Sequence, residues 1–217
     1  MTFALYGHPF SSYTWKALIA LYAAEAEFEF RTVGPDHPDN LAFVRREHPA
    51  GKFPVLTHGG TTIVEATAIL EYLHLHHPAL AQLIPAKPDD AVTIRMLDRV
   101  FDNYVMGNMQ RVVNAYLADA NNPDPAEVAA GKDGLNRTYR WLERWLRENS
   151  LPAHISLITC AAAPSLFYAD WVEPIPANCP RVAALRAELL TLPPVGRCVD
   201  EARPWRRFFP LGAPDRD

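Results

Sequence analysis

Two adjacent serines, Ser11 and Ser12, stand directly before an amphipathic segment, where their hydroxyls are placed to do chemistry. In that segment Trp15, Leu18 and Tyr22 follow the three- and four-residue spacing of one helix face. Serine is a preferred N-cap residue, and the free N–H groups and dipole of a helix N-terminus favour an anion. The serines therefore cap this helix, hold an anion at its start, or do both.

Glu65 has a similar position, just before a second helix-like segment at about residues 66–77. The amides at that helix start are a natural seat for a carboxylate, and Glu65 itself can pair with a cation. Upstream, Pro54 follows Phe53, and only X-Pro bonds adopt the cis form at an appreciable frequency. Sequence chemistry leaves both isomers open, and an ordinary edge-strand proline is the alternative.

Patterns of several other sites are absent from the sequence. No serine lies in a GxSxG elbow, and there is neither a P-loop nor a dinucleotide fingerprint. His74 and His77 can share a helix face, but no third metal ligand accompanies them. The three cysteines form neither a CxxC pair nor a zinc pattern. We expect no metal, no prosthetic group, and free thiols in a reducing compartment.

The elements that must hold the serines and Glu65 are predicted from hydrophobic patterns. Short β-prone runs at residues 2–6 and 28–33 flank the first helix, and another helix is expected at 39–48. Gly59 and Gly60 separate the runs PVLTH and TTIVE, as in a tight hairpin. The order β-α-β-α-β-β-α predicts a small mixed α/β sheet covered by helices.

In the second half of the chain, the spacing of apolar residues predicts helices and no strands. A stretch with three prolines between residues 77 and 90 is typical of a linker. Helical spacing of apolar residues follows at 94–105 and 135–146, and further helices are expected at 156–171 and 180–190. We predict an α/β domain at residues 1–78, a linker at 79–89 and an all-α bundle at 90–217.

Composition and charge limit the classes of partner that the protein is expected to bind. The 217 residues are 49% hydrophobic and carry a net charge of −4, so no general basic field attracts a phosphate backbone. No apolar run approaches the ~18 residues that span a membrane, and the N-terminus lacks a signal-peptide pattern. We expect a cytoplasmic protein with neither nucleic acid nor membrane as a partner.

Three motifs, taken in this element order, resemble the glutathione S-transferase superfamily. They are LYGHPFSSYTWKALIAL at the first strand-to-helix turn, GKFPVL at 51–56 and VEATAILEYL at 64–73. With SLITCAAAPSLFYADW in the second half, the resemblance spans nearly the whole chain. The first motif is similar to the serine-type phi, theta and zeta classes. The resemblance implies a thioredoxin-like N-terminal domain followed by an all-α domain, and a homodimer.

The resemblance also implies that glutathione is the co-substrate and that its thiolate is the nucleophile. A free thiol has a pKa near 8.5, and lowering it by ~2 units takes about 2.7 kcal/mol, within reach of a charge-assisted hydrogen bond and a helix N-terminus. The phi and theta pattern assigns the hydroxyl donor to Ser11, whereas the cysteine of the beta class aligns nearer Ser12. Tyr6 and Tyr13 are rival donors, because other classes use a tyrosine near the first strand.

Further glutathione contacts follow from the same resemblance. The backbone of Phe53, which precedes a cis proline in the family, pairs with the cysteinyl part of glutathione. Glu65 pairs with the ammonium group, and the helix start after it takes the γ-glutamyl carboxylate. Lys52 and His37 attract the glycyl carboxylate, with solvated surface residues as the alternative. The implied glutathione-binding set is Ser11, Lys52, Phe53, Pro54, Glu65, Ala66, Thr67 and His37.

Two positions depart from the family pattern. Ala66 stands where the family usually has serine, so one hydroxyl to the γ-glutamyl carboxylate is missing. Its loss costs about 1.5–3 kcal/mol of affinity unless Thr67 substitutes. Thr159 stands where an aspartate usually completes a capping box with Ser156, so we expect weaker local stability there.

The expected reaction is attack of the thiolate on a small hydrophobic electrophile in the cleft between the domains. The predicted electrophile site consists of Phe10, Tyr13, Tyr104, Met109 and Tyr116, with core packing as the alternative for the last three. The tail WRRFFP, at 205–210, is expected to pack against the helical domain rather than to cover the acceptor. Alternatives to a conjugating transferase are a glutathione-dependent isomerase, a dehalogenase, a peroxidase or a non-catalytic binding module.

Overall fold

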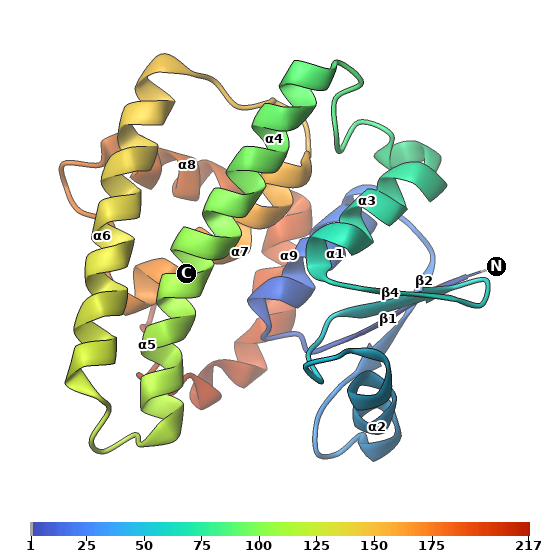
Figure 1. Ribbon diagram of the computed structural model, residues 1–217, viewed down its shortest axis with the longest axis horizontal. Coiled ribbons are helices and arrows are strands. Elements are labelled where there is room, and N and C mark those ends of the chain that lie inside the picture. Colours follow the sequence, from blue (N-terminus) through green and yellow to red (C-terminus); the bar gives the residue numbers. More distant parts are fainter. Residues whose placement is uncertain (1) are drawn as a thin grey trace.

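The structure, a computed structural model, describes residues 2–217 and combines a four-stranded mixed sheet with a large helical region (Figure 1). The strands are β1 (Phe3–Gly7), β2 (Phe28–Thr32), β3 (Val55–His58) and β4 (Thr61–Val64), in the order β2-β1-β3-β4. β1 runs parallel to β2 and antiparallel to β3, and β3 and β4 form an antiparallel hairpin. The predicted fold class is therefore confirmed.

Alternate residues of β1 enter two different cores, because successive side chains of a strand point to opposite faces of the sheet. Phe3 and Leu5 join the large core shared with the helical region. Ala4 and Tyr6 join a small core that α2 (Pro38–Glu47) closes through Val44. Figure 1 accordingly shows α2 on one side of the sheet and α1 (Ser12–Ala23) and α3 (Ala66–His76) on the other.

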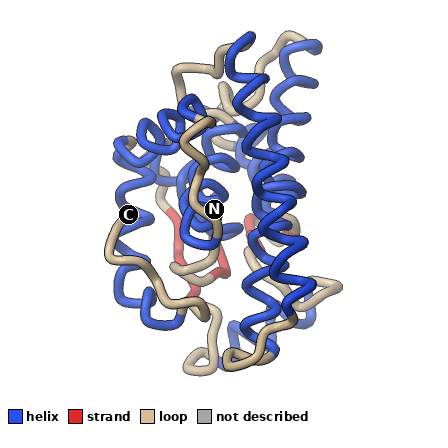
Figure 2. The backbone as a smooth tube through the Cα atoms, turned by 90° about the vertical axis from the view of Figure 1, so that its left-hand side faces the viewer, coloured by secondary structure: helices blue, strands red, loops and turns tan. Residues whose placement is uncertain are grey.

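The helical region begins with one long rod made of α4 (Pro88–Val100), a π-helical segment η2 (Phe101–Met106) and α5 (Gly107–Ala118). α6 (Pro125–Glu148) packs along α5, and α7 (Leu157–Val172) is buried over its whole length. α8 (Pro180–Thr191) completes the set of predicted helices. The short 3-10 turn η1 (Pro78–Leu80) follows α3. The tube in Figure 2 shows how far helices dominate and how the short strands lie among them.

The last part of the chain is more helical than predicted. α9 (Pro193–Ala202) buries Val195, Cys198 and Val199 at helical spacing, and a 3-10 helix η3 (Arg203–Phe208) follows it. Two prolines and a glycine obscure this pattern, although proline is well tolerated in the first turn of a helix. α9 packs against α1, so this segment supports the helix that begins at the serine pair.

The structure contains the capping box with Thr159 in place of an aspartate, and the weaker local stability stays a prediction. The Ser156 N–H donates to Thr159 Oγ1 over 3.1 Å, and the Thr159 N–H points back to Ser156 Oγ at 3.5 Å. Threonine therefore completes the capping box at the start of α7 as an aspartate would.

Within residues 2–217, no helix combines the length and the apolar character needed to cross a bilayer. The three cysteines, Cys160, Cys179 and Cys198, are buried and unpaired.

Candidate active site

Ser11 is the N-cap of α1. Its backbone is extended, and its Oγ accepts a hydrogen bond from the Thr14 N–H over 3.2 Å. The capping role is thus present in the structure. A serine hydroxyl has one proton to donate and two lone pairs, so accepting from Thr14 leaves the O–H available to an anion.

Ser12 is the first residue of α1 and is 7% exposed. Its hydroxyl makes no hydrogen bond within residues 2–217, and it lines the same cleft as Ser11. Both serines therefore present a hydroxyl at the helix N-terminus, and the choice between them stays a prediction.

The turn between β1 and α1 is held by polar contacts at each step. The indole N–H of Trp15 donates to the Pro9 carbonyl over 2.6 Å, and the Phe10 N–H donates to His8 Nδ1 over 3.1 Å. Burial lowers the pKa of His8, which favours the neutral ring that this contact requires. At Gly7 a Cβ would lie 2.5 Å from Thr14 Cγ2, so the strand can approach α1 this closely only through glycine.

A cleft of about 500 Å³ opens beside the serines. It lies between the start of α1, the segment before β3, one face of α5, and the end of η3 with the residues that follow it. The lining residues are Phe10, Ser11, Ser12, Tyr13, Gly51, Lys52, Phe53, Met109, Gln110, Val113, Asn114, Leu117, Tyr168, Phe208, Phe209 and Pro210. One wall is mostly apolar, and Lys52 is the one cationic side chain among these residues.

Of the predicted electrophile-site residues, the structure brings Phe10, Tyr13 and Met109 to this cleft. Tyr104 lies elsewhere: it lines a separate groove of about 540 Å³ with Val100 and Trp141. Tyr116 is half-buried against the hydrophobic core and is absent from the cleft lining.

Sequence reasoning missed two parts of the cleft wall. Val113 and Leu117 continue the face of α5 that Met109 begins, so helical spacing alone was a usable signal for them. Phe208 and Phe209 carry no local signal, because their place depends on how α9 turns the tail back. Phe209 packs as predicted against the helical region, edge-on to Trp171, and it also borders the cleft.

The rival tyrosine donors have different surroundings. Tyr6 is buried under the sheet, stacks on Phe43 and receives a hydrogen bond from Arg31, so its hydroxyl is engaged away from the cleft. Tyr13 lines the cleft, and burial together with the charge of Asp102 raises its pKa to about 12. Tyr13 therefore remains a neutral phenol at any physiological pH.

Among the residues expected to bind glutathione, Phe53 and Pro54 are joined by a cis peptide bond. Phe53 and the exposed Lys52 border the cleft, and Pro54 is buried behind them. His37 is exposed at the N-terminus of α2 and is not part of the cleft lining.

Glu65 is the N-cap of α3 and has a positive φ of 70°. Such a backbone is uncommon for a residue other than glycine and gathers at functional sites. Its side chain is 73% exposed, and Oε1 lies 3.5 Å from Nε2 of the buried His48. The Ala50 N–H donates to His48 Nδ1, which directs the Nε2 proton of a neutral ring toward Glu65.

The amides at the start of α3 are free to bind an anion. The first intrahelical bond runs from the Ile69 N–H to the Glu65 carbonyl, so the three preceding N–H groups have no acceptor within the helix. Ala66 is buried and supplies no hydroxyl. The Thr67 hydroxyl contacts Asp98 Oδ2 and Lys16 Nζ, at 2.9 Å each, so it is committed to other partners rather than replacing the missing serine.

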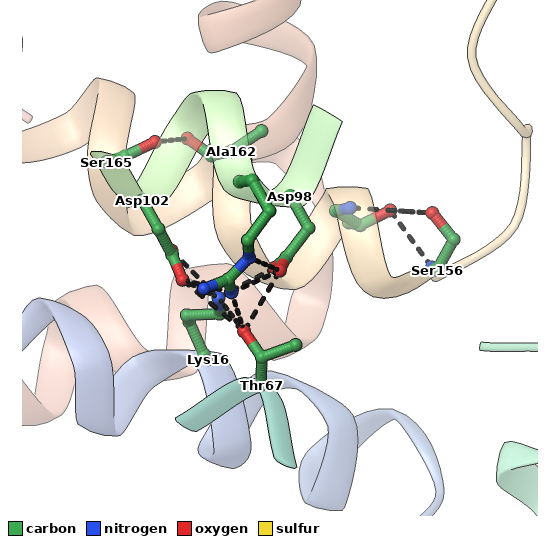
Figure 3. A network of polar contacts seen from close by, with 9 residues as sticks. Lys16, Thr67, Asp98, Asp102, Ser156, Ala162 and Ser165 are labelled. Carbon is green, nitrogen blue, oxygen red and sulfur yellow. Dashed lines mark hydrogen bonds and ion pairs between the residues drawn. The ribbon is translucent and has the colours of Figure 1, made fainter. Parts of the chain in front are cut away.

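Thr67 belongs to a buried charge cluster that sequence reasoning missed (Figure 3). Lys16 Nζ lies 2.7 Å from Asp98 Oδ1 and 2.7 Å from Asp102 Oδ2, and the Lys16 side chain has no exposed surface. Arg99 contacts both carboxylates from the solvent side. The only sequence signal was a lysine four residues after Ser12, on the same face of a helix whose other faces are apolar.

Within residues 2–217, no group of three or more histidine, cysteine, aspartate or glutamate side chains is arranged to hold a metal ion.

Comparison with known proteins matches residues 1–74 to the family described as glutathione S-transferase, N-terminal domain. A probable maleylacetoacetate isomerase of Vibrio cholerae is 25% identical over 94% of this chain and 98% of its own. Glutathione S-transferase 1 of Dianthus caryophyllus is 32% identical over 66% of this chain and 64% of its own.

Solved structures extend the likeness to the whole fold. A glutathione S-transferase from Methylobacterium radiotolerans, in complex with glutathione sulfonate, superposes with a TM-score of 0.76 at 24% identity, over 92% of this chain and 95% of its own. Glutathione transferase F7 from Populus trichocarpa superposes with a TM-score of 0.77 at 18% identity, over 92% of this chain and 99% of its own. Residues 1–74 therefore match a glutathione S-transferase N-terminal domain, and the chain as a whole shares the fold of these solved transferases.

Proposed function

We propose that this protein is a glutathione transferase that joins the thiolate of glutathione to a small, neutral, hydrophobic electrophile. One observation carries the proposal: the hydroxyls of Ser11 and Ser12 lie at the N-terminus of α1, in one cleft with Phe53 and an apolar wall from α5. The helix dipole and a hydroxyl donor both favour a thiolate at that point.

In this proposal glutathione lies along the N-terminal domain, which we place at residues 1–78. Its cysteinyl backbone pairs with Phe53, and its thiolate receives a hydrogen bond from Ser11 or Ser12. Its γ-glutamyl end meets the start of α3, where the strained backbone of Glu65 and three free amides support binding of a carboxylate and an ammonium group. Lys52 attracts the glycyl carboxylate.

The electrophile occupies the other side of the cleft, against the helical domain that we place at residues 90–217. Its wall combines the apolar side chains of Met109, Val113 and Leu117 with aromatic rings from the loop and the tail. Aromatic and aliphatic linings of this kind favour flat, apolar ligands.

A second candidate, a glutathione-dependent isomerase, is suggested by the relative named probable maleylacetoacetate isomerase. Maleylacetoacetate carries two carboxylates, and the cleft lining offers Lys52 alone as a cation, already assigned to glutathione. This shortage of cationic partners favours conjugation of a neutral electrophile.

The test begins with retention on immobilised glutathione, followed by conjugation of an aryl halide. Ser11→Ala or Ser12→Ala is expected to lower kcat/KM by on the order of a hundredfold for the serine that holds the thiolate. Ser150→Ala, in the exposed loop after α6, is the matched control and should retain full activity.

The outcomes separate the alternatives. Retention without serine-dependent turnover would indicate a non-catalytic binding module, and failure of both measurements would exclude glutathione as the co-substrate. Turnover of maleylacetoacetate well above that of the aryl halide would favour the isomerase. Dehalogenase and peroxidase activities are tested by replacing the aryl halide with a haloalkane or a hydroperoxide.

The homodimer remains a proposal that rests on the family resemblance, and the cytoplasmic location remains a proposal that rests on the sequence pattern of the N-terminus and the cysteines. An exposed apolar stripe on α4, with Val92 at 66% and Met96 at 42% exposure, supports a subunit contact on that helix. Light scattering after size exclusion will show whether the particle has twice the mass of one chain.

A further inference from the structure

We propose that Lys16 is a positioning residue for glutathione: its buried ammonium group joins the helix of the serine pair to the helix that receives the γ-glutamyl end, and it neutralises the carboxylates behind both. This inference rests on the proposed function, because it assumes that glutathione lies between Ser11 and the start of α3.

The contacts of Lys16 reach three elements at once. On α3, its Nζ lies 2.9 Å from Thr67 Oγ1. On the long rod, it lies 2.7 Å from Asp98 Oδ1 at the end of α4 and 2.7 Å from Asp102 Oδ2 in η2. All three protons of the ammonium group have oxygen partners, as a lysine with no exposed surface requires.

The position of Lys16 in sequence explains why it can act on the site. It lies four residues after Ser12, so both side chains project from the same face of α1. Its partner Thr67 is the second residue of α3, directly after Ala66 and two residues after Glu65. The Lys16–Thr67 contact is therefore a direct polar link between the two ends of the proposed glutathione site.

Charge gives Lys16 a second effect on the site. Lys16 and Arg99 together balance Asp98 and Asp102, so the fully ionised cluster is neutral. Arg99 is 47% exposed, whereas both carboxylates are nearly or fully buried. Removing the lysine leaves one excess negative charge behind the start of α3, where a carboxylate of glutathione is expected, and low dielectric surroundings make that charge effective.

A purely structural role predicts different kinetics from a positioning role. If Lys16 only stabilised the fold, its loss would reduce the fraction of folded protein, lowering the apparent kcat and leaving KM unchanged. A positioning residue of the glutathione site changes the affinity for glutathione in molecules that remain folded.

The experiment measures glutathione binding by calorimetry and the kinetics of conjugation for wild type, Lys16→Met and the double variant Lys16→Met/Asp102→Asn. Methionine replaces the aliphatic stem of lysine with an unbranched apolar chain and lacks its charge, and the second change restores a neutral cluster of Asp98 and Arg99. Lys132→Met is the control, since Lys132 makes a surface ion pair with Glu173 over 3.4 Å, within the helical region.

We expect Lys16→Met to weaken glutathione binding and raise its KM by on the order of tenfold, with kcat at saturating glutathione within about threefold of wild type. The double variant should recover much of the lost affinity, and Lys132→Met should match wild type. If Lys16→Met does not fold, the double variant alone is compared with wild type: a weakened affinity supports the positioning role of Lys16, and an unchanged affinity overturns it.

The proposal is overturned if Lys16→Met lowers kcat while the dissociation constant for glutathione stays at the wild-type value, or if the double variant binds no better than the single one. Calorimetry keeps this result separate from the proposed function. If wild type binds glutathione but shows no serine-dependent turnover, the proposed transferase function is refuted. The effect of Lys16 on glutathione binding can still be measured in that case.

Discussion

The hydroxyl of Tyr168 on α7 donates a hydrogen bond to the carbonyl of Phe10, over 3.1 Å. The two residues are 158 positions apart in sequence. This contact therefore fixes the turn before Ser11 against the buried centre of the helical region, and it joins the parts of the chain that form opposite sides of the cleft.

Tyr168→Phe removes this bond and leaves the Phe10 carbonyl without its partner. Because the Tyr168 side chain is only 2% exposed, we expect the free energy of unfolding to fall by about 1–3 kcal/mol. Urea denaturation measures the change. Tyr116→Phe is the matched control, since Tyr116 is half-buried and its hydroxyl makes no hydrogen bond within residues 2–217. Equal losses in the two variants would refute the importance of the Phe10 contact.

Glu143, on α6, caps the N-terminus of α8. It lies on α6, is 5% exposed, and its Oε2 accepts from the N–H groups of Arg181 at 2.8 Å and Val182 at 3.2 Å, at the start of α8. Glu143→Leu deprives both amides of an acceptor and removes a negative charge from the positive end of the helix. We expect a loss of about 2–4 kcal/mol in thermal or urea unfolding.

Glu148→Leu controls for the change of residue type, because Glu148 is exposed at the end of the same helix. Its effect on stability should stay below about 0.5 kcal/mol. A loss at Glu143 no larger than this would show that water replaces the carboxylate at the start of α8.

The order of elements was predictable from sequence because it depends on local patterns. Gly59 and Gly60 do adopt positive φ angles, of 58° and 85°, at the predicted hairpin. Ser11 caps its helix for the same local reason, since the residue type and the apolar spacing after it suffice to predict a helix start.

The faces of the long rod were harder to predict. Tyr104 and Met109 are five residues apart, which separates them by roughly 140° around an α-helix. The π-helical segment Phe101–Met106 between α4 and α5 also carries more residues per turn, so it changes the phase of every side chain after it. Met109 consequently reaches the cleft, and Tyr104 faces another groove.

Lys16 was missed for a different physical reason. A lysine on a helix is ordinarily solvated, and its burial here depends on two aspartates more than 80 residues later in the sequence. No local pattern reports a partner at that separation. The tail residue Phe208 is similar, since only the packing of α9 brings it to the cleft.

Phe208→Ala tests the acceptor side of the cleft. Phe208 is 57% exposed and borders the cleft with the neighbouring Phe209, so its ring is available to an apolar ligand. We expect KM for an aryl halide to rise about fivefold, which corresponds to ~1 kcal/mol of lost apolar contact. KM for glutathione in the same assays serves as the internal control and should not change. A rise in the glutathione KM alone would place the electrophile elsewhere.

His8 makes the turn before Ser11 sensitive to pH. Its Nδ1 accepts the Phe10 N–H, which only a ring unprotonated at that atom can do, and burial lowers its pKa below the ordinary value of 6.5. Below pH 6.5 the unfolded chain takes up a proton at this histidine before the folded chain does. Stability from His8 is therefore present above 6.5 and is lost as the pH falls through the lowered folded value.

His8→Asn separates this contribution from the other titrating groups. Asparagine can still accept the Phe10 N–H through its side-chain oxygen, but it does not titrate. We expect the free energy of unfolding of wild type, relative to His8→Asn, to stay level from pH 8 to about pH 7 and to decrease as the pH falls from 6.5 to 5, as measured by urea denaturation at each pH. A difference that stays constant over this range would mean that the folded and unfolded chains protonate His8 alike, and that the ring nitrogen is not needed to hold the turn.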